Sequence, residues 1–283
     1  MRPLLACAAL LVAGASLLPA QAMRSYTTSR PARAGDPALL RTTLDFGAGR
    51  VVLRAGATDQ LYRMQLRYDA ERFAPIHAYE PAVGALHLGL EQQGRGGIRV
   101  TSRAQLEQVA RFEFAPHVPL ELTANLGASE ATLDLGDLSI AALMVRSGAT
   151  RGIVDFSRPT RGECRGATFA VGATELSVMH LANAGCAELR VEGGVGRAIL
   201  DFSGTWRRSP TLSVALAMGT LTLRVPRGTG VRIRGDKVLT SIAGEGLARA
   251  GDVWSTADFA TATRTVDVEL KTSVAGVELD WID

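Results

Sequence analysis

The chain has 283 residues, of which 47% are hydrophobic, a share that is sufficient for a sizeable core and too high for a largely disordered protein. Aromatic residues make up only 5% and there are 30 glycines, which favours thin, regularly stacked layers over a bulky globular centre. The formal net charge of +3 is small and both signs are interspersed, so no basic surface of the kind that binds nucleic acid is predicted.

The first 22 residues have the pattern of a cleaved secretory signal peptide. Arg2 precedes an apolar run that ends in the small-x-small sequence AQA. A membrane anchor is the alternative, but the run is shorter than about 20 residues and is broken by Pro19. We therefore predict an exported protein, in the periplasm or at the cell surface, with no transmembrane segment in the mature chain. Residues 23–39 are predicted to follow as a polar linker.

Residues 40–283 are predicted to form a single β-rich domain, whose first part, residues 40–118, is an N-terminal rung and cap. The segment LDFGAGRVVLRAG resembles one repeat of the region that follows, and YRMQLRY and GALHLGLEQ alternate apolar with polar residues as half-buried strands do. The segment SRAQLEQVARF is compatible with a short helix. An atypical cap is expected here because a terminal repeat must cover an exposed layer.

Residues 119–283 contain a repeat marked by glycine. Similar nine-residue segments begin at Gly127, Gly148, Gly172, Gly194 and Gly219, at intervals of 21 to 25 residues. Three apolar columns recur at fixed offsets from these glycines, with mostly polar or small residues between them. They comprise Leu122, Leu143, Ala167, Leu189 and Val214 at five residues before, Ala124, Val145, Phe169, Val191 and Leu216 at three before, and Leu133, Val154, Val178, Leu200 and Val225 at six after. The local period of two residues indicates strands and excludes helix.

An interval of 21 to 25 residues is too long for simple hairpins and matches one coil of a solenoid. Coils stacked about 4.8 Å apart would align the apolar columns and pair each backbone with the coil above or below. We therefore predict an all-β fold, a right-handed parallel β-helix with about 21–25 residues per rung and an atypical β-rich N-terminal cap. The repeated glycine is expected at a tight turn that tolerates positive φ and close backbone approach. An antiparallel sandwich is the alternative.

Removal of the signal peptide leaves two cysteines, Cys164 and Cys186. An even pair in an exported protein is a disulfide candidate. Each stands eight residues before a repeat glycine, so the two are expected in one column of adjacent rungs, at a Cα separation of about 4.8 Å that a disulfide accepts. The sequence therefore predicts a bridge between them, and two buried free thiols are the alternative.

The C-terminal segment TVDVELKTSVAGVELDWID alternates apolar with charged residues. Val266, Val268 and Leu270 are expected to be buried against charged neighbours. We predict that this segment is a half-buried strand that closes the stack.

Signatures of catalysis or metal binding are absent from the sequence. It lacks the HExxH, GxSxG and paired CxxC motifs, and its four histidines, His77, His87, His117 and His180, are scattered without metal-ligand spacing. The segment GGVGRA lies between two predicted strands with no helix after it, so it is interpreted as a turn and not as a phosphate site. We predict no catalytic residue, no cofactor and no metal site.

One column of carboxylates is a candidate for catalysis or for calcium binding. Asp134, Asp155 and Asp201 each stand seven residues after their glycine, with Met179 between the last two, and are expected to project outward in one column. Aspartates on such a face can cleave acidic polysaccharides, and a carboxylate column can bind calcium. The same copies hold no obvious basic or acidic partner and Met179 interrupts the column, so we interpret it as a solvated strand face.

The segments LDFGAGRVVLRAGATDQLYRMQLRYDAERF, LELTANLGASEATLDLGDL, VEGGVGRAILDFSG and VAGVELDW together resemble the bacterial toast-rack family. That family is grouped with putative adhesins and with LiaF-like cell wall-active antibiotic response proteins. The resemblance implies a β-solenoid that acts in the envelope by contact, and it supplies no catalytic residues. Many relatives place this domain behind membrane helices and take part in envelope stress regulation, whereas this chain begins with a predicted signal peptide.

The leading hypothesis is an exported, non-enzymatic β-solenoid that serves as a structural, adhesion or interaction module of the cell envelope, with an envelope protein or glycan as its partner. The alternatives are a polysaccharide-acting β-helix enzyme that uses the aspartate column and an accessory sensor of envelope stress that binds a membrane partner. A groove lined by carboxylates would favour the enzyme, whereas a shallow surface without convergent polar groups would favour adhesion.

Overall fold

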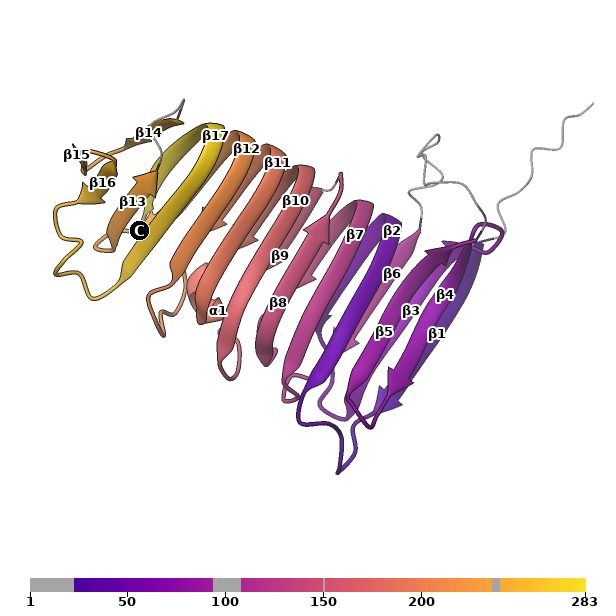
Figure 1. The fold of residues 1–283 in the computed structure, drawn as a ribbon. Helices are drawn as coiled ribbons and strands as arrows, with labels where there is room; N and C mark the ends of the chain where they lie inside the picture. Colours follow the sequence, from indigo (N-terminus) through magenta and orange to yellow (C-terminus); the bar gives the residue numbers. More distant parts are fainter. Residues whose placement is uncertain (1–22, 94–107, 150, 236–239) are drawn as a thin grey trace, which may run out of the picture.

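Long strands stacked side by side form most of the molecule (Figure 1). The structure is a computed structural model that describes residues 23–93, 108–149, 151–235 and 240–283, so the predicted signal peptide lies outside the described residues. In chain order the elements are β1 (Met23–Pro31), β2 (Leu40–Ala55), β3 (Gln60–Asp69), β4 (Phe73–Glu80), β5 (Ala85–Gln92), β6 (Val109–Phe114), β7 (Leu120–Asp134), β8 (Ile140–Ser147), β9 (Arg151–Asp155), β10 (Cys164–Met179), α1 (Leu181–Ala184), β11 (Cys186–Asp201), β12 (Thr211–Pro226), β13 (Gly230–Gly235), β14 (Thr240–Gly244), β15 (Leu247–Ala250), β16 (Val253–Thr256) and β17 (Thr265–Ile282).

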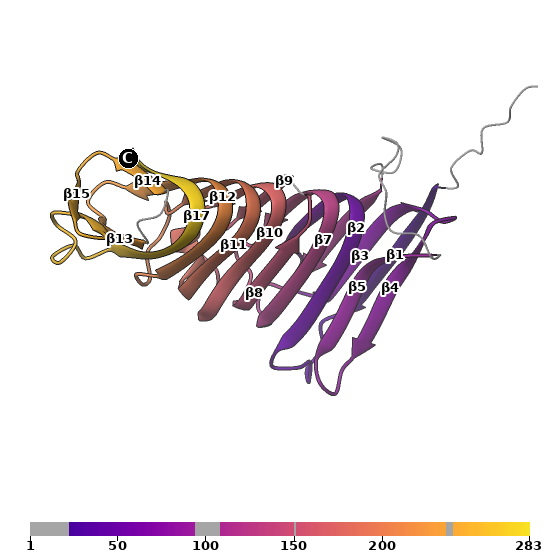
Figure 2. The same ribbon diagram turned by 45° about the horizontal axis from the view of Figure 1, so that its top comes forward.

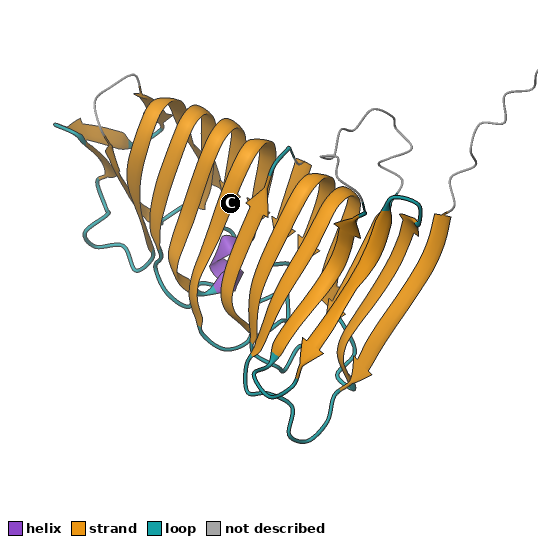
Figure 3. Cartoon of the chain, turned by 45° about the vertical axis from the view of Figure 1, so that its right-hand side comes forward, coloured by secondary structure: helices purple, strands orange, loops and turns teal. Residues whose placement is uncertain are grey.

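Most rungs of the stack are single long strands that bend near their middle (Figures 2 and 3). Strands β2, β7, β10, β11, β12 and β17 have 15 to 18 residues each, and one further rung is split at the bend into β8 and β9. We call the layer of first halves layer 1, the layer of second halves layer 2, and the line of bends between them the bend edge. The buried apolar side chains form one cluster inside this stack.

The two layers share the long strands and differ at their ends. Layer 1 runs β4-β5-β2-β7-β8-β10-β11-β12-β17-β13-β16-β15, and layer 2 runs β1-β3-β6-β2-β7-β9-β10-β11-β12-β17-β14. The rungs pair in parallel, and antiparallel pairs occur only toward the two ends of the stack. The all-β prediction is therefore confirmed, and the antiparallel alternative is wrong for the rungs.

The predicted columns coincide with the observed register in the first four copies and slip in the fifth. Leu189 lies beside Leu212, not Val214, and Gly219 lies beside Gly196. The predicted frame of the fifth copy is thus wrong by two residues. A slip of two leaves every side chain on the same face of a strand, so the apolar pattern could not reveal it.

Close packing between rungs explains two of the repeated glycines, Gly127 and Gly172. A Cβ atom on Gly172 would lie 2.6 Å from the carbonyl oxygen of Gly148, and one on Gly127 would lie 2.1 Å from that of Gly47. The predicted close approach is therefore confirmed. The positive φ also considered for these glycines occurs at Gly219, with φ of 148°, and not at the four preceding repeat glycines.

The N-terminal cap differs from the sequence prediction in two places. Residues 23–31, predicted as part of a polar linker, form β1 and pair antiparallel with β3. Polar residues predominate on both faces of β1, so the sequence lacks a strand pattern, and the free edge of β3 supplies the hydrogen bonds. The end of the predicted helix SRAQLEQVARF belongs to β6, where Ala110 and Phe112 are buried, and its earlier part lies outside the described residues apart from Gln108.

The last strand occupies a different place from the one predicted. Val266, Val268 and Leu270 of β17 are buried, as expected. However, β17 lies between β12 on one side and β13 and β14 on the other. The strands of the outer end, β13 to β16, thus precede β17 in the sequence, although β17 lies inside them in the stack. No local sequence pattern encodes this order.

Candidate interaction site

The three predicted aspartates lie in one row across the rungs. Asp134 is the register neighbour of Asp155, which in turn neighbours Met179. Ser157 Oγ donates a hydrogen bond of 2.6 Å to Asp134 Oδ1, and His180 Nδ1 lies 2.7 Å from Asp155 Oδ1. Two of the three carboxylates are therefore already bonded to residues that adjoin the row.

A basic residue extends this row where none was expected. Arg224 is the register neighbour of Asp201, and its NH1 group donates a 3.0 Å hydrogen bond to Asp201 Oδ2. The Asp201 side chain is only 5% exposed, so it does not project into solvent as predicted. The prediction missed the arginine because the two-residue slip of the fifth copy had placed Pro226 in this position.

The aspartate row consequently acts as an internal link between rungs. Its carboxylate oxygens accept hydrogen bonds or form ion pairs with adjoining protein groups. Over the described ranges, no group of three or more His, Cys, Asp or Glu residues is placed to hold a metal ion. The geometry gives no support to a pair of free carboxylates acting on a bound polysaccharide.

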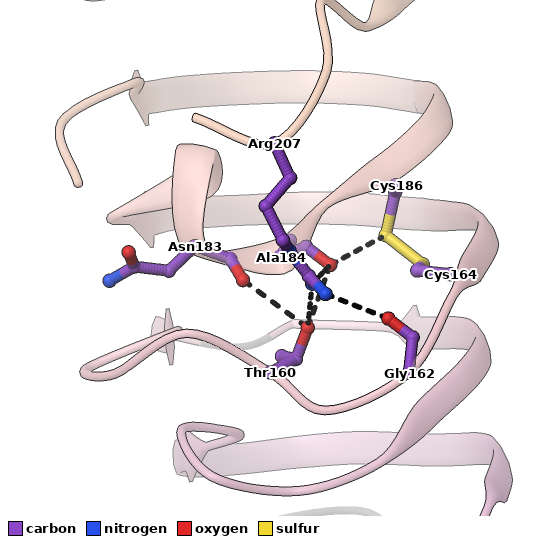
Figure 4. Close-up of a disulfide and its surroundings, with 7 residues drawn as sticks. All are labelled: Thr160, Gly162, Cys164, Asn183, Ala184, Cys186 and Arg207. Carbon is purple, nitrogen blue, oxygen red and sulfur yellow. Dashed lines mark hydrogen bonds between the residues drawn. A yellow bond between two sulfur atoms is a disulfide. The ribbon is translucent and has the colours of Figure 1, made fainter. Parts of the chain in front are cut away.

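The predicted disulfide between Cys164 and Cys186 is confirmed. The two cysteines are register partners at the first residues of β10 and β11, with Cα atoms 4.3 Å apart, and both are buried. The bridge lies beside the turns that face away from the bend edge, next to α1 (Figure 4). Because the sulfur atoms are covered, the bridge has a structural role in this position.

Hydrogen bonds around the disulfide join turns of successive rungs (Figure 4). Thr160 Oγ1 donates to the carbonyl oxygen of Ala184 at 2.8 Å. Arg207 NH2 donates to Thr160 Oγ1 at 2.7 Å, and Arg207 NH1 donates to the carbonyl oxygen of Gly162 at 2.8 Å. These contacts link the turns that precede β10, β11 and β12 to one another.

Two adjoining open hollows mark the outer face of layer 1, and Arg146 lines both. The first, with a volume of about 640 Å³, lies at the bend edge over a floor of glycines, and most of its lining is apolar. The second, of about 410 Å³, lies on the strand face over the small residues Ala142 and Gly166. The polar side chains that line them are Asp45, Asn125 and Arg146 in the first and Glu121, Thr123, Arg146, Arg165, Thr168 and Glu188 in the second.

Donors and acceptors alternate across the strands that carry these hollows. Asn125 Nδ2 donates to Asp45 Oδ1 at 2.7 Å, and His87 Nε2 lies 2.5 Å from Asp45 Oδ2. Arg165 NH2 forms a 3.1 Å ion pair with Glu121 Oε2. The sequence analysis missed this site because its polar side chains come from five strands, although Asn125 and Arg146 share the offset of two residues before the glycine.

Among the described residues, four groups at the two ends of the stack have shifted pKa values. Burial raises the pKa of Tyr62 and of Tyr79 at the N-terminal end, and Tyr62 Oη lies 2.9 Å from His77 Nε2. At the C-terminal end a hydrogen bond with Asp267 raises the pKa of Arg232. Burial would raise the pKa of Asp267, but the hydrogen bonds and charges of Arg232 and Arg234 outweigh it, so this pKa lies below its usual value.

These features define an all-β protein of stacked parallel strands with an open outer face on layer 1. The chain belongs to the toast-rack family, because the model of the N-terminal domain of toast_rack, DUF2154, matches residues 24–165, just over half of the chain. The family resemblance seen in the sequence is thus confirmed. No curated protein matches the chain. In the described parts of the chain, no helix has the length and apolar character needed to cross a membrane.

Two solved structures of bacterial proteins are similar to this chain. A putative cell adhesion protein from Clostridium sporogenes has 15% identity and a TM-score of 0.47, with 92% of this chain and 100% of that chain covered. A putative adhesin from Bacteroides fragilis has 10% identity and a TM-score of 0.41, with 92% of this chain and 98% of that chain covered.

Proposed function

We propose that this protein is an exported, non-enzymatic contact module of the cell envelope, which binds an envelope protein or glycan through the outer face of layer 1. The observation that carries the proposal is the pair of open hollows that share Arg146 and are lined by side chains of both charge signs. Shallow, open surfaces of this kind suit recognition by many weak contacts better than the enclosure of a small substrate. Membership of the toast-rack family supports the same conclusion.

A non-enzymatic role is supported by what the carboxylates of the aspartate row contact. Asp134 accepts a hydrogen bond from Ser157, Asp155 pairs with His180 and Asp201 pairs with Arg224. Glycoside hydrolysis needs two carboxyl groups that face the scissile bond from a cleft. The proposal also includes a right-handed coil for the rungs and a mature chain that begins at residue 23, after removal of the predicted signal peptide.

The test is co-sedimentation of the purified protein with isolated cell envelopes. The variant Arg146→Glu with Arg165→Glu reverses two charges in the hollows and should lower the bound fraction at least about tenfold. The groups of the envelope partner that attracted the arginines would then face side chains of their own charge sign. Arg111→Glu is the matched control, because Arg111 is exposed on β6 in layer 2, away from the hollows. It should bind as the unaltered protein does.

Two outcomes would count against the proposal. Equal binding by the Arg146 and Arg165 variant and by the Arg111 control would show that the outer face of layer 1 is not the contact surface. Release of reducing ends from uronate polymers, abolished by Asp155→Asn, would instead establish the polysaccharide-acting enzyme.

A further inference from the structure

The bend edge, which holds the first hollow beside β8, carries on β10, β11 and β12 apolar side chains that the proposed envelope contact does not use. Among the described residues, the large hydrophobic side chains exposed to solvent are Val83, Ile153, Val195 and Met218. Val195 and Met218 are 56% and 54% exposed and are register neighbours on β11 and β12. Exposed Ala173 of β10 precedes Val195 in the same row. Single exposed apolar residues are ordinary, but a row on adjacent rungs is typical of an interaction surface.

A ladder of exposed charges that alternate in sign lies two residues beyond this row. Successive register neighbours on the rungs are Arg50, Glu130, Arg151, Glu175 and Arg197. Pairs within the ladder lie 3.3 Å apart between Arg50 and Glu130 and 3.2 Å apart between Arg151 and Glu175. Arg197, the last member, has no ion-pair partner within the described parts of the chain.

The order of these charges indicates which partner fits the bend edge. An alternating ladder has little net charge, so it has no preference for an anionic membrane or a polyanion. Reversed about a two-fold axis between its last two members, however, the ladder sets Glu175 of one copy opposite Arg197 of the other, and Arg197 opposite Glu175. An isologous contact, in which the same patch of two copies meets about a two-fold axis, brings about such a reversal.

We propose that the bend edge is an isologous interface with a second copy of this chain. The two-fold axis runs along the strands, between β10 and β11. It sets Ala173 of one copy against Val195 of the other, and Glu175 of one copy against Arg197 of the other.

The neighbouring rows are compatible with this arrangement. In the row two residues before the glycines, the reversal sets Ala170 opposite Glu192 and Arg146 opposite Ala215, so no like charges meet. In the apolar row the reversal sets Met218 of β12 in one copy against the rung of β8 and β9 in the other. Met218 is therefore covered by the interface, as Val195 is. The interface supplies Arg197 with a carboxylate and removes the apolar row from water.

The test measures self-association by sedimentation equilibrium of the protein expressed from the full 283-residue sequence. The unaltered protein should form a dimer. Val195→Asp with Met218→Asp should weaken the dimer roughly 100-fold, because two buried apolar contacts become buried carboxylates. Val83→Asp is the matched control, since Val83 is 54% exposed but lies in the turn between β4 and β5, and it should leave the dimer constant unchanged.

Charge reversal gives a second and independent readout. Glu175→Arg alone and Arg197→Glu alone should each weaken the dimer about tenfold, and the double variant should regain most of the affinity because both signs are then exchanged. Any of three results would overturn the proposal. The unaltered protein could stay monomeric at the highest concentration, or the Val83 variant could weaken the dimer as much as the Val195 and Met218 variant does. The double charge variant could also form a dimer no stronger than those of the single variants. Circular dichroism of each variant establishes that the fold is retained.

Discussion

At the scale of single residues, close packing between rungs and not backbone conformation explains some of the glycines at the bend edge. The four repeat glycines before Gly219 do not have positive φ, yet Cβ atoms would approach the preceding rung at Gly127 and Gly172 more closely than real Cβ atoms do. At Gly148 and Gly194 the same atom would make an ordinary contact of 3.5 Å. Residues that look identical in the repeat therefore differ in how much substitution they tolerate.

This difference gives a matched pair of substitutions. Gly172→Ala should lower the free energy of unfolding by about 1–3 kcal/mol, because its Cβ would lie 2.6 Å from a backbone oxygen and the rungs must separate. Gly194→Ala should change it by less than about 0.5 kcal/mol, since ordinary contact replaces empty space. Urea unfolding followed by circular dichroism measures both values. Equal losses would show that conformational freedom, and not packing, is what the repeat conserves at this offset.

Single residues also determine what the aspartate row contacts. The offset analysis located Asp134, Asp155 and Asp201 in one row correctly, because their copies are in register. It could not find Arg224, because the last copy is displaced by two residues and a strand has a period of two. The sequence thus predicted where the carboxylates lie and not what they contact.

At the scale of elements, the disulfide and the turns beside it hold neighbouring rungs in register. Cys164 and Cys186 are register partners, and the bonds of Thr160 and Arg207 connect turns that precede β10, β11 and β12. The cysteine pairing was predictable because both residues lie in correctly aligned copies at the same offset. The turn contacts were not, because loop residues carry no periodic signal.

Removal of the bridge should therefore weaken the stack measurably. The cysteines are separated by 22 residues, and in the chain-entropy model closing a loop of this size contributes roughly 3 kcal/mol. Cys164→Ser and Cys186→Ser should each lower the melting temperature, and the double variant should lower it by no more than either single variant. Reduction of the unaltered protein should reproduce the shift, while a melting temperature that does not respond to reductant would contradict the assigned role.

At the scale of the whole molecule, the stack has two different ends. The N-terminal end is closed by β1, β3 and β4, where Tyr62 and Tyr79 pack with Arg30 and His77. At the C-terminal end β17 returns between β12 and β13, and Asp267 accepts hydrogen bonds from Arg232 and Arg234 of β13. These polar ends differ from the apolar columns between them, which is how a stack of finite length avoids further growth.

The interaction of Asp267 with Arg232 and Arg234 at the C-terminal end predicts that the stability of the protein depends on pH. Because the pKa of Asp267 is lower in the folded protein than its usual value, its contribution is present above the unfolded pKa of about 3.9 and is lost as the pH falls through the folded pKa. Asp267→Asn should therefore reduce stability to urea at pH 7 and make progressively less difference below about pH 4.

The control for this prediction is Glu269→Gln, which removes a carboxylate on the same strand. Glu269 is half exposed and pairs with Lys271 at 3.3 Å, so its loss should change stability by less than about 1 kcal/mol at any pH. A difference between the Asp267 variant and the unaltered protein that stays constant from pH 7 to pH 3 would mean that the side chain acts by packing and not by charge.

The sequence by itself determined the all-β character, the parallel rungs, the apolar columns of four copies, the cysteine pairing and the family, because each rests on a period or an offset that is repeated locally. Tertiary structure alone decided the strand β1, the two-residue shift of the last copy, the return of β17 into the stack and the hollows around Arg146. These depend on which strand edge is free and which rungs become neighbours. The apolar pattern of a strand is unchanged by a shift of two residues, and the order of strands in the chain does not determine their order in space. Only the packed molecule could therefore decide these features.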